Sequence, residues 1–440
     1  PEKHPLKYFS RLLYDASIMK IAIKILVLIL LLLLATVFTA VFLFRNEISA
    51  ILSIELRKPR GENTLQCGIY EMTFNGNYYF EDYLEQGGAK DDRELLDFIM
   101  KKMTKGLVPV KINASKIGCS SFTAKKSDGQ RLFARNYYLY STNTCLVRVR
   151  GNKKRHASIS TVDLSFINIP ASKNVDSLAL KALCLAAPYV PLDGINDAGV
   201  SCALYMTYQG DGKKVVATNQ NTDLKDLSST TFMRMLLDYA DSLEEAVKIA
   251  SQFDMHDSAG TSFHYMVADS SGRSAILEWV NAKNGLDGDG SLRKLVVTYN
   301  DDDSHIGLRE AKADFQWVTN FIIQPGYYEF YDTAHLKGWD RYKIIYDRLS
   351  KSGGIVEDEM SAMQVLKMAA QRTIRPNRDA KDTILTVHSA IYNLDEKSVL
   401  WCGNEQFSDG EGMFCYKFDA KKRMFVRHLK IKPRMVTISK

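Results

Sequence analysis

The most prominent hydrophobic pattern is an uninterrupted apolar segment near the N-terminus. Residues Ile25–Phe44 carry no charge, and the consecutive Ile, Leu and Val residues that begin at Ile25 leave no polar face. A helix of about 20 apolar residues spans the hydrocarbon core of a bilayer. We therefore predict a transmembrane anchor over residues 21–44.

A buried core helix and a cleaved signal peptide are the alternatives for this segment. A helix that packs one face against a protein core carries polar residues on its other face, and this segment has no polar face. The apolar region of a signal peptide is usually about 7–15 residues long and is followed by small residues at the cleavage site. Ile48-Ser49-Ala50 matches that site weakly, so the sequence favours an uncleaved anchor.

Basic residues on the two sides of the apolar segment predict its orientation. They are, before it, Lys3, Lys7, Arg11, Lys20 and Lys24 and, after it, Arg45, Arg57, Lys58 and Arg60. The excess on the N-terminal side, which also lies closer to the membrane, places residues 1–20 in the cytoplasm by the positive-inside rule. The sequence thus predicts a single-pass protein whose large domain is extracytoplasmic.

Residues 45–118 have the pattern of a juxtamembrane linker followed by a small ordered unit. The basic stretch around Pro59 and Gly61 is typical of a turn or linker. Asp91–Lys105 has an acidic start, apolar residues at helical spacing and a glycine directly after it. These features predict a short helix.

From Cys119 onward the chain shows the pattern of paired strands. Two apolar runs flank Asp128-Gly129, which is a strong hairpin signal. The three predicted hairpins are Ser120–Lys125 with Arg131–Tyr140, Phe263–Asp269 with Ser274–Val280, and Thr383–Leu394 with Ser398–Cys402.

Helical patterns lie between these hairpins. Ser242–Phe253 opens with a capping box, in which a serine precedes a glutamate by three positions. Trp339–Leu349 and Asp358–Gln371 also have apolar residues at helical spacing. Alternating blocks of strands and helices predict an α+β fold with largely antiparallel sheets.

Composition and charge exclude several classes of function. The chain has 440 residues, with 58 basic and 51 acidic side chains and a formal charge of +7. Because no basic run is interleaved with aromatic residues, nucleic-acid binding is not predicted. The eight histidines have no metal-binding spacing and no C-x-x-C occurs, so we predict neither a metal site nor a cofactor.

The seven cysteines are an odd number, so at least one is unpaired within the chain. Cys184 and Cys202 lie in apolar surroundings, which is typical of core residues. Cys119 differs, since it follows Gly118 at the start of a predicted strand.

The sequence around Cys119 resembles the choloylglycine hydrolase, or linear amide C–N hydrolase, family of N-terminal-nucleophile amidases. In that family a nucleophilic cysteine precedes a hairpin and an Arg-Asn-x-Asp motif, and here Arg135 lies 16 residues after Cys119. Three later segments resemble family motifs in the same order: Ala187–Gly199, Leu295–Asn300 and Gly338–Tyr342. The resemblance covers residues 67–430.

The resemblance implies a fold and a set of site residues. The fold would be a four-layer αββα sandwich over residues 119–440, with residues 45–118 as a juxtamembrane linker and prosegment. Cleavage between Gly118 and Cys119 would free the α-amine of Cys119, and the residues up to Gly118 would be kept as an anchored prosegment. The freed α-amine of Cys119 would then serve as the base for its own thiol, since an unassisted thiol is mostly protonated at neutral pH. The implied catalytic residues are Cys119, Arg135, Asn196, Asn300 and Arg341, with Asn196 and Asn300 supplying oxyanion donors.

The chain departs from the family pattern at two positions. Tyr138 occupies the place of the aspartate that orients the amine and thiol, and an ideal hairpin closed by Ser127 and Gln130 would put Tyr138 directly across from Cys119. Tyr299 stands between the threonine and Asn300. We expect both tyrosines to line the substrate pocket.

The sequence therefore predicts a membrane-anchored amidase that cleaves, or transfers the acyl group of, a linear amide such as an N-acyl amino acid or a conjugated bile acid. The alternative is a non-catalytic relative that binds an amphipathic acyl ligand at the membrane surface, which Tyr138 favours. A structural surface protein is a third class. The expected partners are a small amphipathic amide and the membrane, and the sequence leaves a homo-oligomer open.

Overall fold

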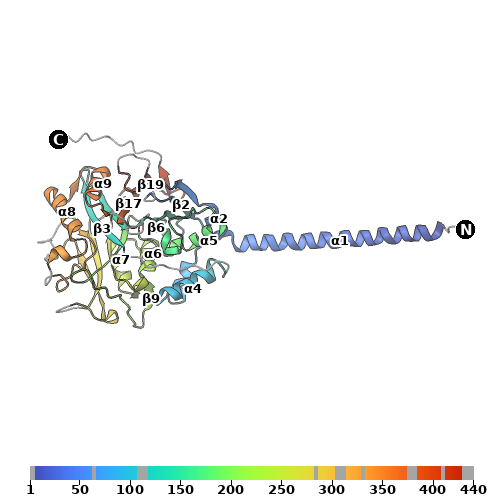
Figure 1. The fold of residues 1–440 in the computed structure, drawn as a ribbon, viewed down its shortest axis with the longest axis horizontal. Coiled ribbons are helices and arrows are strands. Elements are labelled where there is room, and N and C mark those ends of the chain that lie inside the picture. Colours follow the sequence, from blue (N-terminus) through green and yellow to red (C-terminus); the bar gives the residue numbers. More distant parts are fainter. Residues whose placement is uncertain are drawn as a thin grey trace.

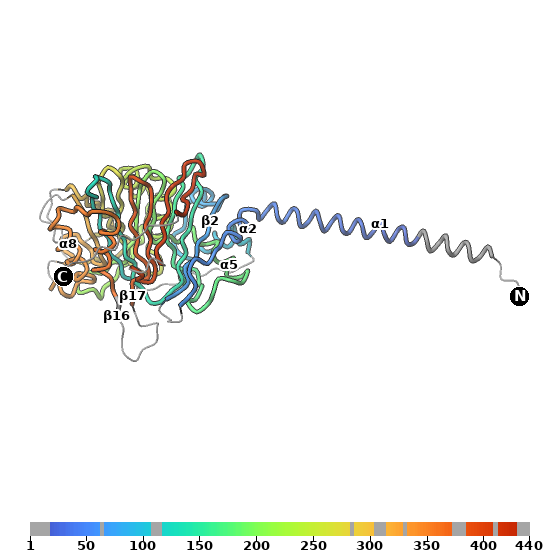
Figure 2. Tube along the Cα trace, turned by 90° about the horizontal axis from the view of Figure 1, so that it is seen from above, coloured from blue at the N-terminus to red at the C-terminus, as the bar shows by residue number. Residues whose placement is uncertain are grey.

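Two nine-stranded β-sheets lie face to face and carry helices on their outer surfaces (Figure 1). This arrangement comes from a computed structural model that describes residues 5–61, 66–106, 117–281, 286–302, 314–328, 332–373, 384–407 and 412–428. A long helix, α1 (Pro5–Leu43), projects away from the sheets (Figures 1 and 2).

The first sheet is antiparallel except at one pair of strands. The strand β2, from the region before Cys119, pairs in parallel with β5. In spatial order the strands are β1 (Glu55–Lys58), β2 (Ile69–Phe74), β5 (Thr144–Val149), β6 (Ser158–Asp163), β7 (Asp193–Asn196), β8 (Ser201–Met206), β11 (Phe263–Ala268), β12 (Ser274–Val280) and β13 (Lys294–Tyr299).

The second sheet contains Cys119 on its strand β3. In spatial order its strands are β14 (Trp317–Val318), β3 (Gly118–Lys126), β4 (Arg131–Leu139), β17 (Ile384–Asn393), β18 (Ser398–Gly403), β19 (Met413–Asp419) and β20 (Met424–His428), while β15 (Ile355–Val356) pairs with β3 and β16 (Arg372–Thr373) with β17. A separate small parallel sheet joins β9 (Lys225–Ser228) and β10 (Phe253–His256).

Helices cover the outer face of each sheet. On the first sheet lie α6 (Ser229–Tyr239) and α7 (Leu243–Ala250), and Arg234 of α6 donates to Ser158 Oγ at 2.7 Å. On the second lie α8 (Trp339–Leu349) and α9 (Glu359–Met368), where Asn136 Nδ2 of β4 donates to Leu366 O at 2.8 Å. These four layers confirm the predicted α+β, αββα fold class.

The shorter helices lie before or between the strands of the first sheet. They are α2 (Arg45–Leu52), α3 (Phe80–Glu85), α4 (Asp92–Lys102) and α5 (Leu178–Leu183). The predicted helix over Asp91–Lys105 is therefore present but shorter, with Asp91 as its N-cap, and helix α8 has the bounds that the sequence predicted. The three predicted hairpins are also present, and Thr383 lies outside the described residues.

The hairpin register at Cys119 differs from the ideal one by one residue. Cys119 pairs with Tyr137, and Tyr138 pairs with Gly118. The reason is a three-residue loop, closed by a hydrogen bond from Lys126 N to Gln130 O at 2.8 Å, in which Gly129 takes a left-handed φ of 98°. Three-residue hairpin loops commonly place glycine at such a position, and the extra residue moves Tyr138 to the opposite face of the sheet.

All seven cysteines lie within the described residues, and none forms a disulfide. Cys184 and Cys202 are buried, as the sequence predicted.

The apolar part of α1, Ile18–Leu43, has a mean hydropathy of 3.1 and exposed side chains. By length and composition it could cross a membrane, and a signal sequence near an N-terminus has the same properties.

Candidate functional site

The thiol of Cys119 lies between the two sheets in contact with a buried arginine. Because Cys119 pairs with Tyr137 and Ser121 pairs with Arg135, the side chains of Cys119 and Arg135 point to the same face. Arg135 Nη2 lies 3.1 Å from Cys119 Sγ and also donates to Leu204 O at 2.8 Å. Neither side chain is exposed to solvent.

The electrostatics of the thiol combine two opposing effects. Burial raises the pKa of the Cys119 thiol, whereas the charge and hydrogen bond of Arg135 and the charge of Arg341 lower it. Burial is the largest effect, so the pKa of Cys119 lies above its ordinary value. In the uncut chain the thiol is therefore held in its protonated form.

Asp193, at the start of β7, is a buried carboxylate that contacts Arg135. No sequence motif pointed to this residue as part of the site. Its Oδ2 accepts from His388 Nε2 at 2.8 Å and lies 3.5 Å from Arg135 Nε, while Oδ1 accepts from Tyr392 OH at 2.5 Å. Burial would raise the pKa of Asp193, but His388, Arg135 and Tyr392 outweigh burial and hold that pKa at about 2. The carboxylate therefore balances the guanidinium that contacts Cys119.

The backbone of Cys119 is bound by two further side chains. Its N–H donates to Asn320 Oδ1 at 2.8 Å, and its carbonyl accepts from Arg341 Nη1. Arg341 Nη2 also donates to Asn320 Oδ1 at 2.8 Å, and Asn320 Nδ2 donates to Met206 O at 2.7 Å. The structure thus brings Cys119, Arg135 and Arg341 together, and it adds Asn320.

Asn300 does not reach this site, which corrects the sequence assignment. Its amide accepts from Ser274 N at 2.8 Å and donates to Gly272 O at 3.3 Å. Gly272 lies against Arg131, at the turn end of the β3–β4 hairpin. Cys119 begins the same hairpin, about 20 Å away at about 3.3 Å per residue.

Tyr299 also lies away from Cys119, with the guanidinium of Arg273 4.8 Å from its ring centre. The segment Thr319-Asn320 offered the better signal, because threonine and asparagine are adjacent there and are interrupted in Thr298-Tyr299-Asn300.

Asn196 stabilises the turn after β7 through its hydrogen bonds. Its Oδ1 accepts from Ala198 N at 3.1 Å and Val200 N at 3.0 Å, and its own N–H donates to Val200 O at 3.0 Å. Its side chain donates to Ala240 O at 2.8 Å. Because its N–H and side chain are committed to these bonds, Asn196 is not available as the oxyanion donor that the resemblance implied.

Tyr138 faces helix α9 rather than the space between the sheets. Its hydroxyl donates to Ala369 O at 2.8 Å and lies 2.6 Å from Ser120 Oγ and 2.9 Å from Asn136 Nδ2. The guanidinium of Arg341 stacks over its ring at 4.7 Å. Tyr138 therefore packs against Arg341, and the residue that contacts the Cys119 thiol is Arg135.

A buried histidine and glutamate hold the loop that carries Asn320. His264 Nε2 lies 2.9 Å from Thr319 O, and its Nδ1 lies 2.7 Å from Glu278 Oε1. The same Glu278 oxygen accepts from Ile323 N at 3.0 Å. Since a nitrogen that faces a carbonyl must carry a proton, the pair binds the loop on both sides of Asn320.

A cavity of about 570 Å³ adjoins the Gly118–Cys119 bond. The described residues that line it are Ile117, Gly118, Tyr208, Gly212, Lys213, Val215, Asn320, Lys337, Gly338, Arg341, Gln371 and Ile384. Neither Tyr138 nor Tyr299 is among these described lining residues. The volume is in the usual range for a small-molecule site.

Comparisons with known proteins give one family match and several similar structures. The family model of linear amide C–N hydrolases, choloylglycine hydrolase family, matches residues 119–287. No curated protein matches the sequence.

Three solved structures are similar in part. A conjugated bile acid hydrolase from Clostridium perfringens has 14% identity and a TM-score of 0.44, covering 71% of this chain and 97% of that one. A penicillin V acylase from Agrobacterium tumefaciens has 13% identity and a TM-score of 0.37, covering 68% and 91%. The Caenorhabditis elegans N-acylethanolamine-hydrolyzing acid amidase ortholog has 17% identity and a TM-score of 0.32, covering 63% and 93%.

The family match agrees with the resemblance that the motifs around Cys119 and Arg135 indicated, and it begins at Cys119 itself. Residues 119–287 are therefore similar to the choloylglycine hydrolase family of linear amide C–N hydrolases.

Proposed function

We propose that the chain is an amidase in which Cys119, freed by cleavage of the Gly118–Cys119 bond, is the nucleophile. The contact of 3.1 Å between Cys119 Sγ and the buried Arg135 carries this proposal. The adjoining cavity and a family match that begins at Cys119 support it. The domain would hydrolyse a linear amide or transfer its acyl group to another acceptor.

The reaction would proceed in two steps. The α-amine of Cys119 takes the thiol proton, Sγ attacks the amide carbonyl carbon, and the C–N bond breaks as the proton passes to the leaving amine. Water then attacks the thioester with the same amine as base, which releases the acid and restores the thiol. Replacing water by another nucleophile gives acyl transfer.

Asn320 would orient the α-amine, a role that the family gives to an aspartate. In the uncut chain its Oδ1 accepts from the Cys119 N–H at 2.8 Å, and the amine formed by cleavage carries hydrogens on the same nitrogen. Arg135 Nη1 is buried and has no hydrogen-bond partner among the described residues. It is therefore free to bind a substrate oxygen.

The membrane-anchored arrangement is part of the proposal. Residues 21–44 would span the bilayer, residues 1–20 would be cytoplasmic, residues 45–118 would form the linker and prosegment, and residues 119–440 the amidase domain. The exposed apolar stretch Ile18–Leu43 supports the anchor.

A binding protein without catalysis is the second candidate. Tyr138 favours it, because the carboxylate of the family motif is missing and the tyrosine hydroxyl bonds to Ala369 O. The two candidates differ in whether the chain is cut before Cys119.

Mass analysis of the purified full chain, together with electrophile labelling, tests the proposed function. We expect a fragment that begins at Cys119 and a thiol labelled by an acyl-type electrophile. Cys119→Ala should abolish both labelling and hydrolysis, while Cys184→Ala, which removes a buried thiol elsewhere, should leave both unchanged. An active sample that contains only uncut chain contradicts the proposal, and an uncut, inactive sample supports the binding protein.

A further inference from the structure

Helix α2, which follows α1 directly, has one face against the domain and one face exposed. Glu47 and Ala50 are buried on the inner face. Arg45, Ile48 and Leu52 are exposed, and because they lie three and four positions apart they share the outer face of the helix. An outer face with one basic and two large apolar side chains is typical of a helix that lies at the boundary between lipid headgroups and acyl chains.

Two basic turns, one from each sheet, are joined to each other by hydrogen bonds. The first turn connects β5 to β6 and the second connects β19 to β20, and their basic side chains are Arg150, Lys153, Lys154, Lys421, Lys422 and Arg423. Gly151 N donates to Arg423 O at 2.9 Å, and Arg150 Nη1 donates to Lys422 O at 3.2 Å. Asp419, at the start of the second turn, accepts from Lys422 N at 3.1 Å. The fold therefore gathers cations that are far apart in the sequence.

Further contacts connect the first of these turns to α2. Arg150 Nε donates to Asn75 Oδ1 at 3.0 Å, and Arg155 Nη2 donates to Gly76 O at 2.7 Å. A Cβ added at Gly76 would overlap Asn46 Oδ1, so Asn46 of α2 packs directly against Gly76. Both α2 and β2 lie at the end of the body from which α1 leaves (Figures 1 and 2). The basic turns are therefore close to the point at which α1 would enter a bilayer.

Three of the four lysines in these turns have no counter-charge in the part of the chain that the structure describes. Lys153, Lys421 and Lys422 are exposed, and no ion pair joins them to a described carboxylate. Lys154 pairs with Glu81 at 2.7 Å. Because like charges that lie close together repel one another, a layer of negative charge beside the turns would stabilise the arrangement.

We infer that the domain rests on the anionic headgroups of the bilayer that holds α1, through a juxtamembrane surface formed by the outer face of α2 and the two basic turns. The inference rests on the proposed anchor and goes beyond it. A single helix leaves the domain free to tilt, whereas this surface sets which face of the domain meets the membrane. The lysines bind lipid phosphates, and Ile48 and Leu52 contact the boundary of the acyl chains.

The first experiment measures how accessible individual lysines are in the full chain, reconstituted in vesicles of phosphatidylcholine alone or with about one third phosphatidylglycerol. Sulfosuccinimidyl acetate does not cross the bilayer, and mass spectrometry gives the acetylation rate of each outward-facing lysine. We expect the rates of Lys153, Lys421 and Lys422 to be about fivefold lower in the anionic vesicles. The difference should disappear at about 1 M salt, where the Debye length is about 3 Å.

Exposed lysines at the opposite end of the domain are the internal control. Helix α8, which contains Lys343 and is followed by Lys351, lies at the end away from α1 (Figures 1 and 2). The acetylation rates of these two lysines should therefore be alike in the two kinds of vesicle. An equal change at both ends of the domain, or no protection of the basic turns, overturns the inference.

A pair of triple variants tests the role of charge. The basic-turn variant carries Lys153→Gln, Lys421→Gln and Lys422→Gln, and the control variant carries Lys343→Gln, Lys351→Gln and Lys367→Gln. All six side chains are exposed, and both variants lose the same net charge. Anionic lipid should slow the acetylation of Lys154 in the parent chain and in the control variant, and it should have no effect on Lys154 in the basic-turn variant. Equal behaviour of the two variants contradicts the inference.

A failure of the proposed anchor would be seen separately. If the full chain does not float with phosphatidylcholine vesicles, the anchor proposal fails, and flotation with the anionic vesicles then measures the juxtamembrane surface alone. Flotation that the basic-turn variant loses and the control variant keeps supports the inference. A parent chain that floats with neither kind of vesicle, or a basic-turn variant that still floats with the anionic ones, overturns it.

Discussion

Arg135 is the residue on which the charges of the site depend. It contacts the Cys119 thiol on one side and the Asp193 carboxylate on the other, and its guanidinium lies 4.4 Å from the ring centre of Tyr205. A buried cation without a counter-charge costs several kcal/mol. Asp193 therefore supplies the counter-charge that stabilises the buried guanidinium beside the thiol.

Asp193 should make the domain sensitive to acid. Its pKa is about 2 in the folded chain and near 4 when unfolded, so the carboxylate stabilises the fold above pH 4. That contribution, about 2 kcal/mol, is lost as the pH falls from 4 to 2. Chemical unfolding across this range should show the loss in the parent chain. Asp193→Asn should be less stable at pH 7 and show less of the acid-dependent loss, and an unchanged acid profile would contradict the assignment.

Glu278 should affect turnover through the position of Asn320. Glu278→Gln removes the charge that faces His264 and loosens the bonds to Thr319 O and Ile323 N. Because Asn320 contacts the Cys119 nitrogen, we expect kcat to fall about tenfold while KM changes less than about twofold. Glu245→Gln, at an exposed pair with Lys248 on α7, is the control. A rise in KM with unchanged kcat would argue against positioning.

The sequence located some of these residues and missed others for physical reasons. The spacing of Cys119 and Arg135 reflects one hairpin, and a hairpin is a local structure that a short motif can specify. Asn320 contacts the backbone nitrogen of Cys119, and Asp193 contacts Arg135. Both come from segments that are distant in the sequence, which no short spacing records. The resemblance points to Asn300 because the strand that it follows, Leu295–Asn300, resembles a family motif. Asn300 nevertheless lies at the turn end of the β3–β4 hairpin, and Cys119 lies at the opposite end.

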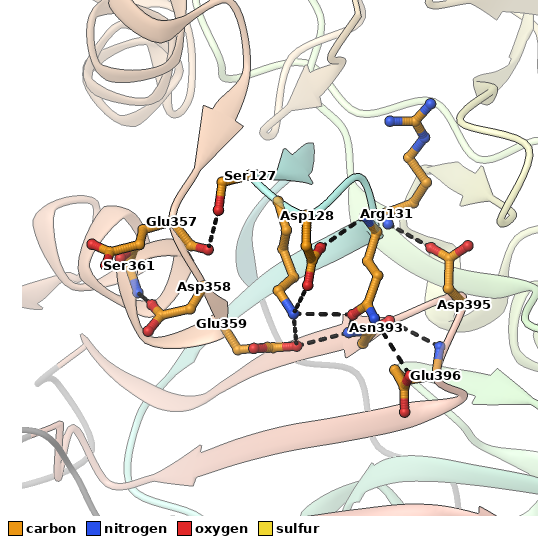
Figure 3. A network of polar contacts seen from close by, with 12 residues as sticks. Ser127, Asp128, Arg131, Glu357, Asp358, Glu359, Ser361, Asn393, Asp395 and Glu396 are labelled. Atoms are coloured by element: carbon orange, nitrogen blue, oxygen red, sulfur yellow. Dashed lines mark hydrogen bonds and ion pairs between the residues drawn. The ribbon is translucent and has the colours of Figure 1, made fainter.

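At the scale of elements, the register of the β3–β4 hairpin determines which of its side chains face the first sheet, as Cys119 and Arg135 do. Its loop is held by charged neighbours, since Lys126 pairs with Asp128 at 3.1 Å and with Glu359 of α9 at 3.2 Å (Figure 3). Arg131 N donates to Asp395 Oδ2 at 2.6 Å, which joins the loop to the turn after β17 (Figure 3). These contacts keep the register that the three-residue loop establishes.

Gly129 should be costly to replace. Its φ of 98° lies in the left-handed region, and an added Cβ would meet no atom within 4 Å, so the cost of alanine is purely conformational. We expect Gly129→Ala to lower the free energy of unfolding by about 1–2 kcal/mol. Gly288→Ala is the matched control, because Gly288 also has open space and no left-handed φ. Equal effects of the two substitutions in denaturant titrations would refute the argument.

The sequence predicted the elements and the three hairpins better than the register between paired strands. Apolar periodicity and Asp128-Gly129 indicated the helices and hairpins, since these depend on neighbouring residues. The strand register depends on the residue that closes the loop around Gly129. Closure by Ser127 would give a two-residue loop, whereas closure by Lys126 gives the three-residue loop that is present. That choice depends on contacts with Glu359 and Asp395, which are distant in the sequence.

At the scale of the whole molecule, the orientation of the proposed anchor can be tested directly. Protease added to intact cells that express the chain should digest the domain and spare the N-terminal 20 residues, because the basic residues before the apolar segment favour the cytoplasm. Immunoblots with tags at the two ends give the measurement. A protected C-terminal tag in intact cells, with digestion after permeabilisation as the control, would contradict the predicted orientation.

Residues before Cys119 also contribute to the folded domain. Tyr78 OH donates to Asp238 of α6, Tyr416 OH donates to Glu71 of β2 at 2.8 Å, and Asn404 Nδ2 donates to Cys67 O at 3.0 Å. These contacts involve both sheets and are independent of the Gly118–Cys119 peptide bond.

The position of β2 has a consequence for a chain cut before Cys119. The N-terminal fragment would remain as a second subunit, because β2 is paired along its length with β5 and releasing it would expose the backbone groups of that strand to solvent. Maturation would then turn one polypeptide into a heterodimer that is held by strand complementation. Attachment of the enzyme to its membrane would depend on the strength of a β-ladder, and a separately expressed N-terminal fragment would be expected to restore a chain that begins at Cys119.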